Sequence, residues 1–290
     1  MQINKSVTTL IEFEKGHTCH NDFLIMDELD RVPMATSKKK EIAVKYCDRK
    51  ILGANDILFL EKSSVADVRM RIFEPDGTEA FMCGNGIIYV ADYLRRKNGF
   101  EKMKIETLAG VREVSLQNGI WVVDMGQLKT KAWEVPIKSE RNDIFINKQI
   151  KVGFKKFNIS IVNSGEPHAV IFLEKNSLYY NDLDKINVEL FGRMIRESEL
   201  FPVGVNVNFV QKINERTIAV RTYERGVEGE TYACGTGSVA SVGVARMLGL
   251  LKSEEVEVVN RGGTHHVEFA DSKLFLKGVP VTLYRGMIEI

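Results

Sequence analysis

Short strands separated by turns are predicted for much of the first half of the chain. Apolar and polar residues alternate over residues 11–17, and the stretch at 67–77 ends in the turn signal Pro-Asp-Gly. Alternation with a period of two places the apolar side chains on one face of a sheet. Further strands are expected over residues 23–27, 56–63, 103–110 and 112–126.

A helix is predicted directly after Cys83. Ile87, Val90, Ala91 and Leu94 recur at helical spacing. Three basic residues follow in the last turn, where they complement the negative end of the helix dipole, and a glycine comes next as a stop signal. The pattern therefore indicates one amphipathic helix between the two groups of strands.

The second half of the chain repeats this plan. Two strands are predicted over residues 155–173, a helix over 181–198, and strands over 204–214 and 216–226. The helix that follows Cys234 is apolar on nearly every side, so it should be buried in the centre of its half. The closing strands are expected at 255–263, 265–270, 273–279 and 282–290.

Many short strands with one central helix in each half predict an α+β fold of two domains, joined near residues 126–135. Composition agrees with a globular chain: 290 residues, 44% hydrophobic and 27% charged. The net charge of +1 gives no reason to expect nucleic acid or a membrane surface as a partner. No apolar run of about 18 residues predicts a membrane span, and the N-terminal stretch lacks a signal peptide, so a cytoplasmic location is expected.

One short motif occurs twice, each time at the start of a predicted helix: cysteine, glycine, a polar residue, glycine. The start of a helix offers unpaired N–H groups and positive partial charge, and glycines let an anion approach them. A cysteine at such a position is expected to have a lowered pKa. The sequence therefore predicts two half-sites for one small anion, such as a carboxylate, each beside a reactive thiol. They are Cys83, Gly84 and Asn85 in the first copy, and Cys234, Gly235 and Thr236 in the second.

Two thiols on opposite sides of a carbon that bears a carboxylate could invert its configuration. One thiolate would remove the α-proton, the other thiol would return a proton to the opposite face, and the N–H groups would stabilise the charge that develops. No zinc-ligand spacing, Walker A loop or dinucleotide motif is present, so neither a metal nor another cofactor is expected. The alternatives are cysteines that only pack, a redox sensor, and a protein that binds an amino acid without turning it over.

The chain resembles the diaminopimelate epimerase family, a cofactor-independent group that uses two cysteines. The resemblance rests on motifs that span the sequence: His17 with Asn21-Asp22-Phe23, Cys47-Asp48-Arg49, and residues 76–86, 165–170, 205–207, 223–227 and 230–237.

That resemblance implies two pseudo-symmetric domains, each a barrel-like, mostly antiparallel sheet around a central helix, with the active site in the cleft between them. It implies an N-terminal domain of residues 1–128 plus 282–290, a C-terminal domain of residues 129–281, and a homodimer. Cys83 and Cys234 would be the acid–base pair. The substrate-binding residues would be Asn21, Glu74, Gly84, Asn85, Glu166, Asn206, Glu224, Arg225, Gly235 and Thr236.

The substrate implied by the resemblance is diaminopimelate, converted from the LL to the meso form in lysine biosynthesis. Two departures open an alternative, because Glu74 and Glu166 stand where the family pattern has asparagines that bind the distal end of diaminopimelate. Carboxylates there would repel a distal carboxylate and attract a cation. The alternative substrate is therefore a cationic amino acid such as lysine, arginine, ornithine or histidine. If the glutamates point away or pair with Arg225, diaminopimelate remains the substrate. Another departure lies at residues 51–56, where the usual Gly-Ile-Gly-Ala-Asp-Gly reads Ile-Leu-Gly-Ala-Asn-Asp.

Overall fold

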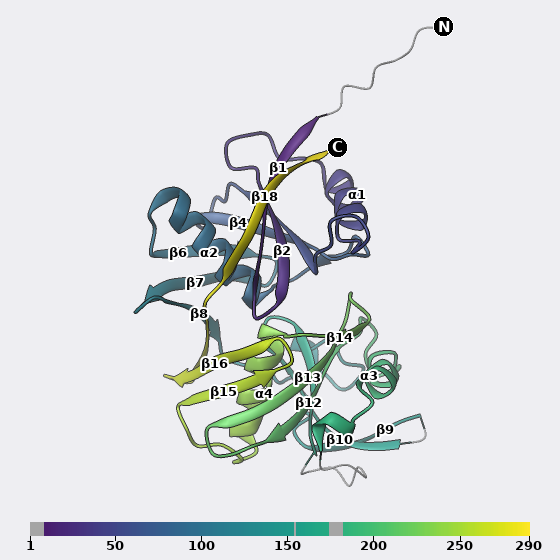
Figure 1. The fold of residues 1–290 in the computed structure, drawn as a ribbon. Coiled ribbons are helices and arrows are strands. Elements are labelled where there is room, and N and C mark those ends of the chain that lie inside the picture. The colour runs from purple at the N-terminus through teal and green to yellow at the C-terminus, as the bar shows by residue number, and fades with distance from the viewer. Residues whose placement is uncertain (1–8, 154, 174–181) are drawn as a thin grey trace, which may run out of the picture.

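Two halves of similar plan lie one above the other in a computed structural model that describes residues 9–153, 155–173 and 182–290 (Figure 1). The upper half in Figure 1 contains β1 (Leu10–Thr18), β2 (Asn21–Asp27), α1 (Thr36–Tyr46), β3 (Asp56–Glu61), β4 (Val68–Phe73), β5 (Glu79–Ala80), α2 (Gly84–Asn98), β6 (Lys102–Thr107), β7 (Gly110–Gln117) and β8 (Ile120–Gly126).

The lower half contains η1 (Ala132–Glu134), β9 (Lys148–Val152), β10 (Lys155–Asn163), β11 (Pro167–Phe172), η3 (Leu183–Lys185), α3 (Val188–Arg196), β12 (Asn206–Lys212), β13 (Thr217–Glu224), β14 (Gly229–Thr231), α4 (Gly235–Met247), β15 (Glu255–Asn260), β16 (Gly263–Ala270) and β17 (Lys273–Gly278). The last strand, β18 (Val281–Glu289), returns to the upper half and lies antiparallel to β1 (Figure 1).

Both halves follow one order of strand pairing. In the first, β1 is antiparallel to β2, β2 is parallel to β3, β3 is antiparallel to β4, and β4 is parallel to β6, which leads antiparallel into β7 and β8. The strands β10, β11, β12, β13, β15, β16 and β17 repeat each step. A parallel step needs a crossover, and α1, α2, α3 and α4 supply the four of them.

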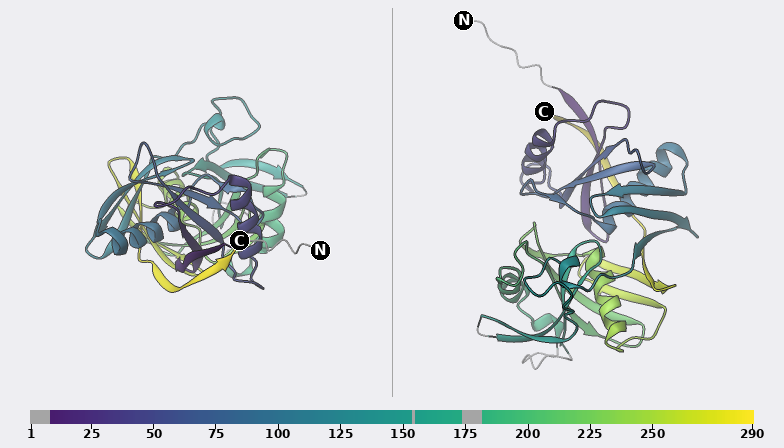
Figure 2. Two further views of the ribbon diagram at one scale, coloured as in Figure 1. Left: turned by 90° about the horizontal axis from the view of Figure 1, so that it is seen from above. Right: turned by 180° about the vertical axis from the view of Figure 1, so that it is seen from behind.

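The predicted fold class, α+β with a mostly antiparallel sheet around a central helix in each half, is confirmed. Helix α4 contacts β10, β11, β12, β13, β15, β16 and β17, and its residues are buried from Gly235 to Ala245. Helix α2 is buried over Gly84–Ala91 and exposes its basic last turn. Figure 2 shows the same two bodies from above and from behind.

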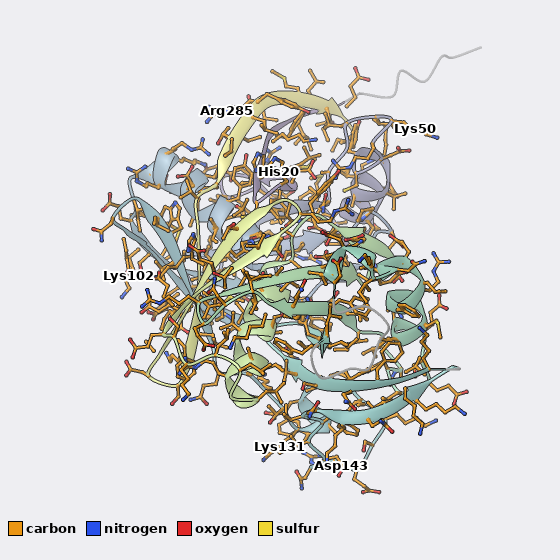
Figure 3. All side chains as sticks on the ribbon, turned by 60° about the horizontal axis from the view of Figure 1, so that its bottom comes forward. His20, Lys50, Lys102, Lys131, Asp143 and Arg285 are labelled. Atoms are coloured by element: carbon orange, nitrogen blue, oxygen red, sulfur yellow. The ribbon has the colours of Figure 1, made fainter. Side chains whose placement is uncertain are left out.

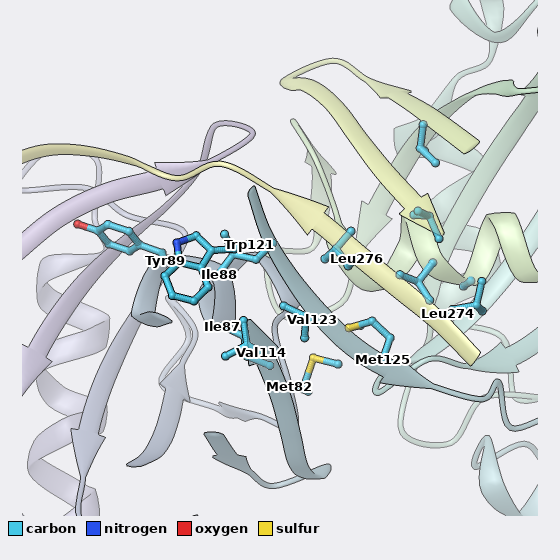
Figure 4. Close-up of a cluster of buried hydrophobic side chains, with 14 of the residues drawn as sticks. Met82, Ile87, Ile88, Tyr89, Val114, Trp121, Val123, Met125, Leu274 and Leu276 are labelled. Atoms are coloured by element: carbon cyan, nitrogen blue, oxygen red, sulfur yellow. The ribbon is translucent and has the colours of Figure 1, made fainter. Parts of the chain in front are cut away.

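The halves are joined by β8 and β17, which pair antiparallel. Figure 4 shows Leu276 of β17 near Val123 and Met125 of β8, and Leu274 further along the same strand. These four residues belong to one buried cluster that also includes side chains of α2 and α4. The core is therefore continuous across the junction, and the starts of both central helices are held at its edge. The boundary at residues 128 and 129 stays a prediction.

Two helices differ from the sequence-based expectation. Helix α1 was not predicted, because its buried face includes Lys39, whose ammonium pairs with Glu28 and Glu61 inside the protein. Helix α3 begins later than expected, because Asn187 caps it by accepting a hydrogen bond from the N–H of Leu190 at 3.0 Å. The start of the expected helix, at residue 181, lies outside the described residues.

The periphery of the molecule is polar: Figure 3 shows Lys50, Lys102, Lys131, Asp143 and Arg285 at its edges. In the described part of the chain, no helix has both the length and the apolar character needed to cross a membrane. His20, in the turn between β1 and β2, bonds through Nδ1 to the carbonyl of Gly262 in the other half at 2.6 Å. This contact adds a polar link between the halves.

Candidate active site

The two repeated cysteines cap the two central helices. Cys83 is the N-cap of α2 and its sulfur accepts the N–H of Gly86 at 3.4 Å. Cys234 is the N-cap of α4 and accepts the N–H of Gly237 at 3.3 Å. Both cysteines have extended backbone, as N-cap residues require, so each thiol is fixed at the positive end of its helix.

The two helix starts meet at the junction of the halves. A Cβ atom added to Gly235 would lie 3.3 Å from the backbone nitrogen of Asn85, and one added to Gly84 would lie 2.6 Å from Cδ2 of Leu276. Only glycine at these positions leaves that space open, so the glycines permit the close approach of the helix starts. The structure thus brings the two predicted half-sites together.

A narrow pocket of about 50 Å³ lies between the thiols. All of the predicted site residues except Asn85 line it. The lining comprises Asn21, Asp56, Ile72, Glu74, Ala80, Met82, Cys83, Gly84, Glu166, Asn206, Glu224, Arg225, Ala233, Cys234, Gly235 and Thr236.

Asn85 is fully buried beside Gly235 and is held by a histidine that sequence reasoning did not assign to the site. Its Oδ1 accepts a hydrogen bond from Nε2 of His265 at 2.9 Å, and Nδ1 of His265 bonds with the hydroxyl of Ser238 at 2.9 Å. Burial lowers the pKa of His265 to about 4, so the ring is neutral. Nδ2 of Asn85 has no partner among the described residues, which leaves a buried donor at the start of α2.

A second buried histidine stands behind the other loop. Sγ of Cys234 lies 3.3 Å from Oγ1 of Thr236, which lies 2.9 Å from Nε2 of His168. Nδ1 of His168 donates to Oδ1 of Asn208 at 2.8 Å, because the amide nitrogen of Asn208 donates to Thr222. Burial lowers the pKa of His168 to about 4. The neutral ring therefore accepts a hydrogen bond from the Thr236 hydroxyl, and this series of hydrogen bonds ends at the Cys234 thiol.

The expectation of lowered thiol pKa values is wrong for this closed pocket. Burial raises the pKa of Cys83 well above its usual range, and the negative charge of Asp56 raises it further against the opposing N–H groups of Asn85 and Gly86. Burial raises the pKa of Cys234 in the same way, with Glu224 as the neighbouring charge. Loss of water around the sulfur outweighs the helix dipole here, so both thiols are protonated.

Glu166 is paired with Arg225, the one arginine among the described residues that line the pocket. Its Oε2 lies 2.7 Å from Nη2 of Arg225, and its Oε1 accepts the N–H groups of Phe81 at 2.8 Å and Met82 at 3.3 Å. Glu166 and Arg225 belong to one half, and Phe81 and Met82 to the other. Pairing of a glutamate with Arg225 was one of the possibilities that the sequence left open. The ion pair occupies the guanidinium group that a substrate carboxylate would otherwise contact.

Glu74 and Asp56 face the pocket without a cationic partner among the described residues. Glu74 accepts the Thr78 hydroxyl at 2.6 Å, and burial raises its pKa to about 7. Asp56 is 9% exposed, and neither a hydrogen bond nor an ion pair engages its carboxylate within the described chain. Burial and the charge of Glu74 raise the pKa of Asp56 well above its usual range. Asp56 was not predicted as a site residue. The sequence feature that could have identified it is its position where the family motif has a glycine.

The remaining polar groups complete the wall around the thiols. Asn206 accepts the N–H of Arg225 at 2.9 Å and donates to the carbonyl of Pro167 at 3.2 Å. Sγ of Cys83 lies 3.7 Å from Oδ1 of Asn21. All four cysteines of the chain are free, and within the described residues no three His, Cys, Asp or Glu side chains are grouped to hold a metal ion.

Comparison with known proteins points to the same family that the sequence motifs resemble. The sequence model of the diaminopimelate epimerase family matches residues 13–131 and 160–283. A diaminopimelate epimerase of Methanothrix thermoacetophila is 42% identical over 286 residues, covering 96% of each chain, and that of Archaeoglobus fulgidus is 39% identical over 285 residues, covering 97% of each.

Solved structures with a similar fold include a hydroxyproline epimerase from Agrobacterium vitis. Its TM-score is 0.72 at 14% identity, with 97% of this chain and 93% of that chain covered. A PhzF-family phenazine biosynthesis protein of Bacillus anthracis gives a TM-score of 0.63 at 19% identity, with 97% and 100% covered. At identities this low, the similarity shows a shared fold only.

Fold and relatives together define the class of this protein: it is an isomerase of the epimerase and racemase type. Within that class, the chain belongs to the diaminopimelate epimerase family.

Proposed function

We propose that this protein inverts the configuration of an amino acid α-carbon with Cys83 and Cys234 as base and acid. The observation that carries the proposal is the meeting of two thiol-capped helix starts on one pocket. The names of the relatives point to diaminopimelate as the substrate, converted from the LL to the meso form.

The substrate's α-carboxylate would bind at the two helix starts. Unpaired N–H groups of α2 and α4 and the free Nδ2 of Asn85 would donate to it, which favours the negative charge that develops when the α-proton leaves. Asn85 is locked by neutral His265, so its donor is preorganised. Inversion then needs one group on each face of the α-carbon, and the two thiols come from opposite halves of the protein.

One thiol must lose its proton before it can act as a base. Glu224 lies beside Cys234, and its carboxylate can take that proton. The substrate ammonium would replace lost solvation and lower the cost of a thiolate in the closed pocket. After proton abstraction, the other thiol, still protonated, gives its proton to the opposite face. No redox change occurs, and the proposed reaction requires neither pyridoxal phosphate nor a metal.

The test is α-proton exchange with the purified protein in deuterated water. With LL-diaminopimelate we expect deuterium at the inverted α-carbon and accumulation of the meso form. Cys83→Ser and Cys234→Ser should each abolish inversion, while Cys47→Ser, a buried thiol outside the pocket, should keep it. Full inversion by either active-site variant would refute the two-thiol mechanism. Dialysis against a chelator and treatment with hydroxylamine should leave the rate unchanged.

A homodimer in the cytoplasm is part of the proposal. Strand β18 pairs with β1 along one edge, and it exposes Val281, Leu283, Tyr284 and Met287 by 44–62%. An apolar strand edge of this kind is suited to contact with a second copy. Sedimentation should give a dimer, and the double variant Leu283→Glu/Met287→Glu should give a monomer; a monomeric parent protein would contradict the proposal.

A further inference from the structure

The pocket contains more carboxyl groups than proton transfer between two thiols requires. Asp56, Glu74, Glu166 and Glu224 line it, whereas Arg225 is the one Lys or Arg side chain among its described lining residues. Burying several carboxylates together is costly unless cations neutralise them. The arrangement therefore indicates that a positively charged group enters the pocket with the substrate.

Arg225 forms its direct ion pair with Glu166, and it acts on Glu74 only as a nearby charge. The pair is 2.7 Å apart, and two backbone N–H groups of Phe81 and Met82 hold the same carboxylate. A substrate carboxylate that took Arg225 would leave Glu166 buried and without its cation. Removing one partner from a buried ion pair is strongly unfavourable.

Strand register brings Asp56 and Glu74 together. Ile57 pairs with Phe73 in the antiparallel β3–β4 ladder, so the next position of the register aligns Asp56 with Glu74. Like charges at facing positions destabilise a sheet. Asp56 has no hydrogen bond or ion pair among the described residues, although it is buried, with only 9% of its surface exposed. Two facing carboxylates, one of them unpartnered, are suited to bind one cation between them.

The internal repeat provides a comparison within the same molecule. In the other half, Val207 pairs with Tyr223 in the β12–β13 ladder, which aligns Asn206 with Glu224 at the equivalent positions. That half thus has one amide and one carboxylate where the first half has two carboxylates. The extra carboxyl group is specific to the wall of the pocket formed by Asp56 and Glu74.

We infer that Asp56 and Glu74 bind the cationic end of the substrate's side chain, and that the enzyme racemises basic amino acids such as lysine, ornithine and arginine with higher kcat/KM than diaminopimelate. The inference rests on the proposed inversion at the two thiols. A basic amino acid presents a lone cation to this wall. Diaminopimelate presents an ammonium together with a carboxylate, and that carboxylate meets Glu74 and an occupied Arg225.

The first experiment compares substrates on the unmodified enzyme. Deuterium exchange at the α-carbon is measured for lysine, ornithine, arginine and LL-diaminopimelate, with norleucine and 2-aminoadipate as probes of a neutral and an anionic end. We expect at least one basic amino acid to exceed diaminopimelate in kcat/KM by tenfold or more, and no exchange of 2-aminoadipate. Exchange of diaminopimelate without exchange of a basic amino acid would overturn this inference and leave the proposed function intact. Exchange of none of them would overturn both.

The second experiment assigns the preference to the acidic wall. Asp56→Asn/Glu74→Gln should lower kcat/KM for the best basic amino acid by at least tenfold, mainly through KM. Asp30→Asn, which removes a carboxylate that is 86% exposed, should leave it unchanged. Glu166→Gln frees Arg225 and should raise kcat/KM for diaminopimelate relative to the basic amino acid. Equal effects on both substrates in all three variants would contradict a cation-selective wall.

Discussion

Thr236 links a buried neutral histidine to one of the two thiols. Its hydroxyl lies 3.3 Å from Sγ of Cys234 and 2.9 Å from Nε2 of His168. Loss of that hydroxyl leaves the ring nitrogen and the thiol without their common partner. We predict that Thr236→Val lowers kcat about ten- to a hundredfold, because an unmade buried hydrogen bond costs about 1–3 kcal/mol. Steady-state kinetics with Thr236→Ser, which keeps the hydroxyl, is the control, and full kcat in the valine variant would show that the link is unnecessary.

The charge of Asp56 adds to the effect of burial on the pKa of Cys83. Burial raises the pKa of the thiol, and the negative charge of Asp56 raises it further. Asp56→Asn removes that charge, so the pKa of Cys83 should fall and the thiolate fraction at a given pH should rise. We predict faster alkylation of Cys83 by iodoacetamide at pH 8 in this variant, followed by mass spectrometry of the Cys83 peptide. Alkylation as slow as in the parent protein, with Asp30→Asn as the control, would argue against this coupling.

The site residues that could be predicted are those that carry a local signal. Cys83 and Cys234 each stand beside glycines and before a helix, so the motif alone indicates an anion-binding thiol. Asp56 carries only a departure from the family motif and His265 carries no signal, because strand register and the packing of one half on the other bring them to the site. The direction of the thiol pKa shift could not be predicted either, since it depends on how dry the pocket is.

At the scale of elements, the strands and the two central helices could be predicted, and α1 could not. The period of apolar residues identifies a strand or helix whose buried face is apolar. Helix α1 buries Lys39, and a lysine in a sequence is normally read as a position exposed to solvent. Its ammonium contacts Glu28 and Glu61, and its side chain is 0% exposed. A buried ion network is a tertiary feature that no local period reports.

That network gives a test of how α1 is held. Lys39→Met leaves Glu28 buried without its cation and leaves Glu61 with only the 3.5 Å contact to Arg71, so we predict a loss of about 3–5 kcal/mol in the free energy of unfolding. Lys40→Met on the exposed side of the same helix should change it little. Denaturant unfolding measures both variants. If Lys39→Met/Glu28→Gln/Glu61→Gln is no more stable than Lys39→Met, unpaired charge is not the cause.

At the scale of the whole molecule, catalysis depends on how the two halves meet. Each half supplies one thiol, and Leu276 of β17 lies against the first glycine of both loops, 2.6 Å from a Cβ added to Gly84 and 2.9 Å from one added to Gly235. Leu276 is fully buried in the cluster that spans the halves. Its side chain therefore fixes the distance between the helix starts, and with it the spacing of the thiols.

A mutant cycle can separate this spacing from stability. Gly84→Ala should lower kcat/KM sharply, because its methyl group needs the space of Leu276. Leu276→Ala should cost about 2–5 kcal/mol of stability by opening a cavity. In the double variant the new methyl group fits that cavity, so kcat/KM should recover relative to Gly84→Ala alone. Leu274→Ala, also buried on β17 but directed at Gly243 of α4, should give no such recovery. Equal recovery with either leucine variant would mean that softening of the core, and not the spacing of the helix starts, restores activity.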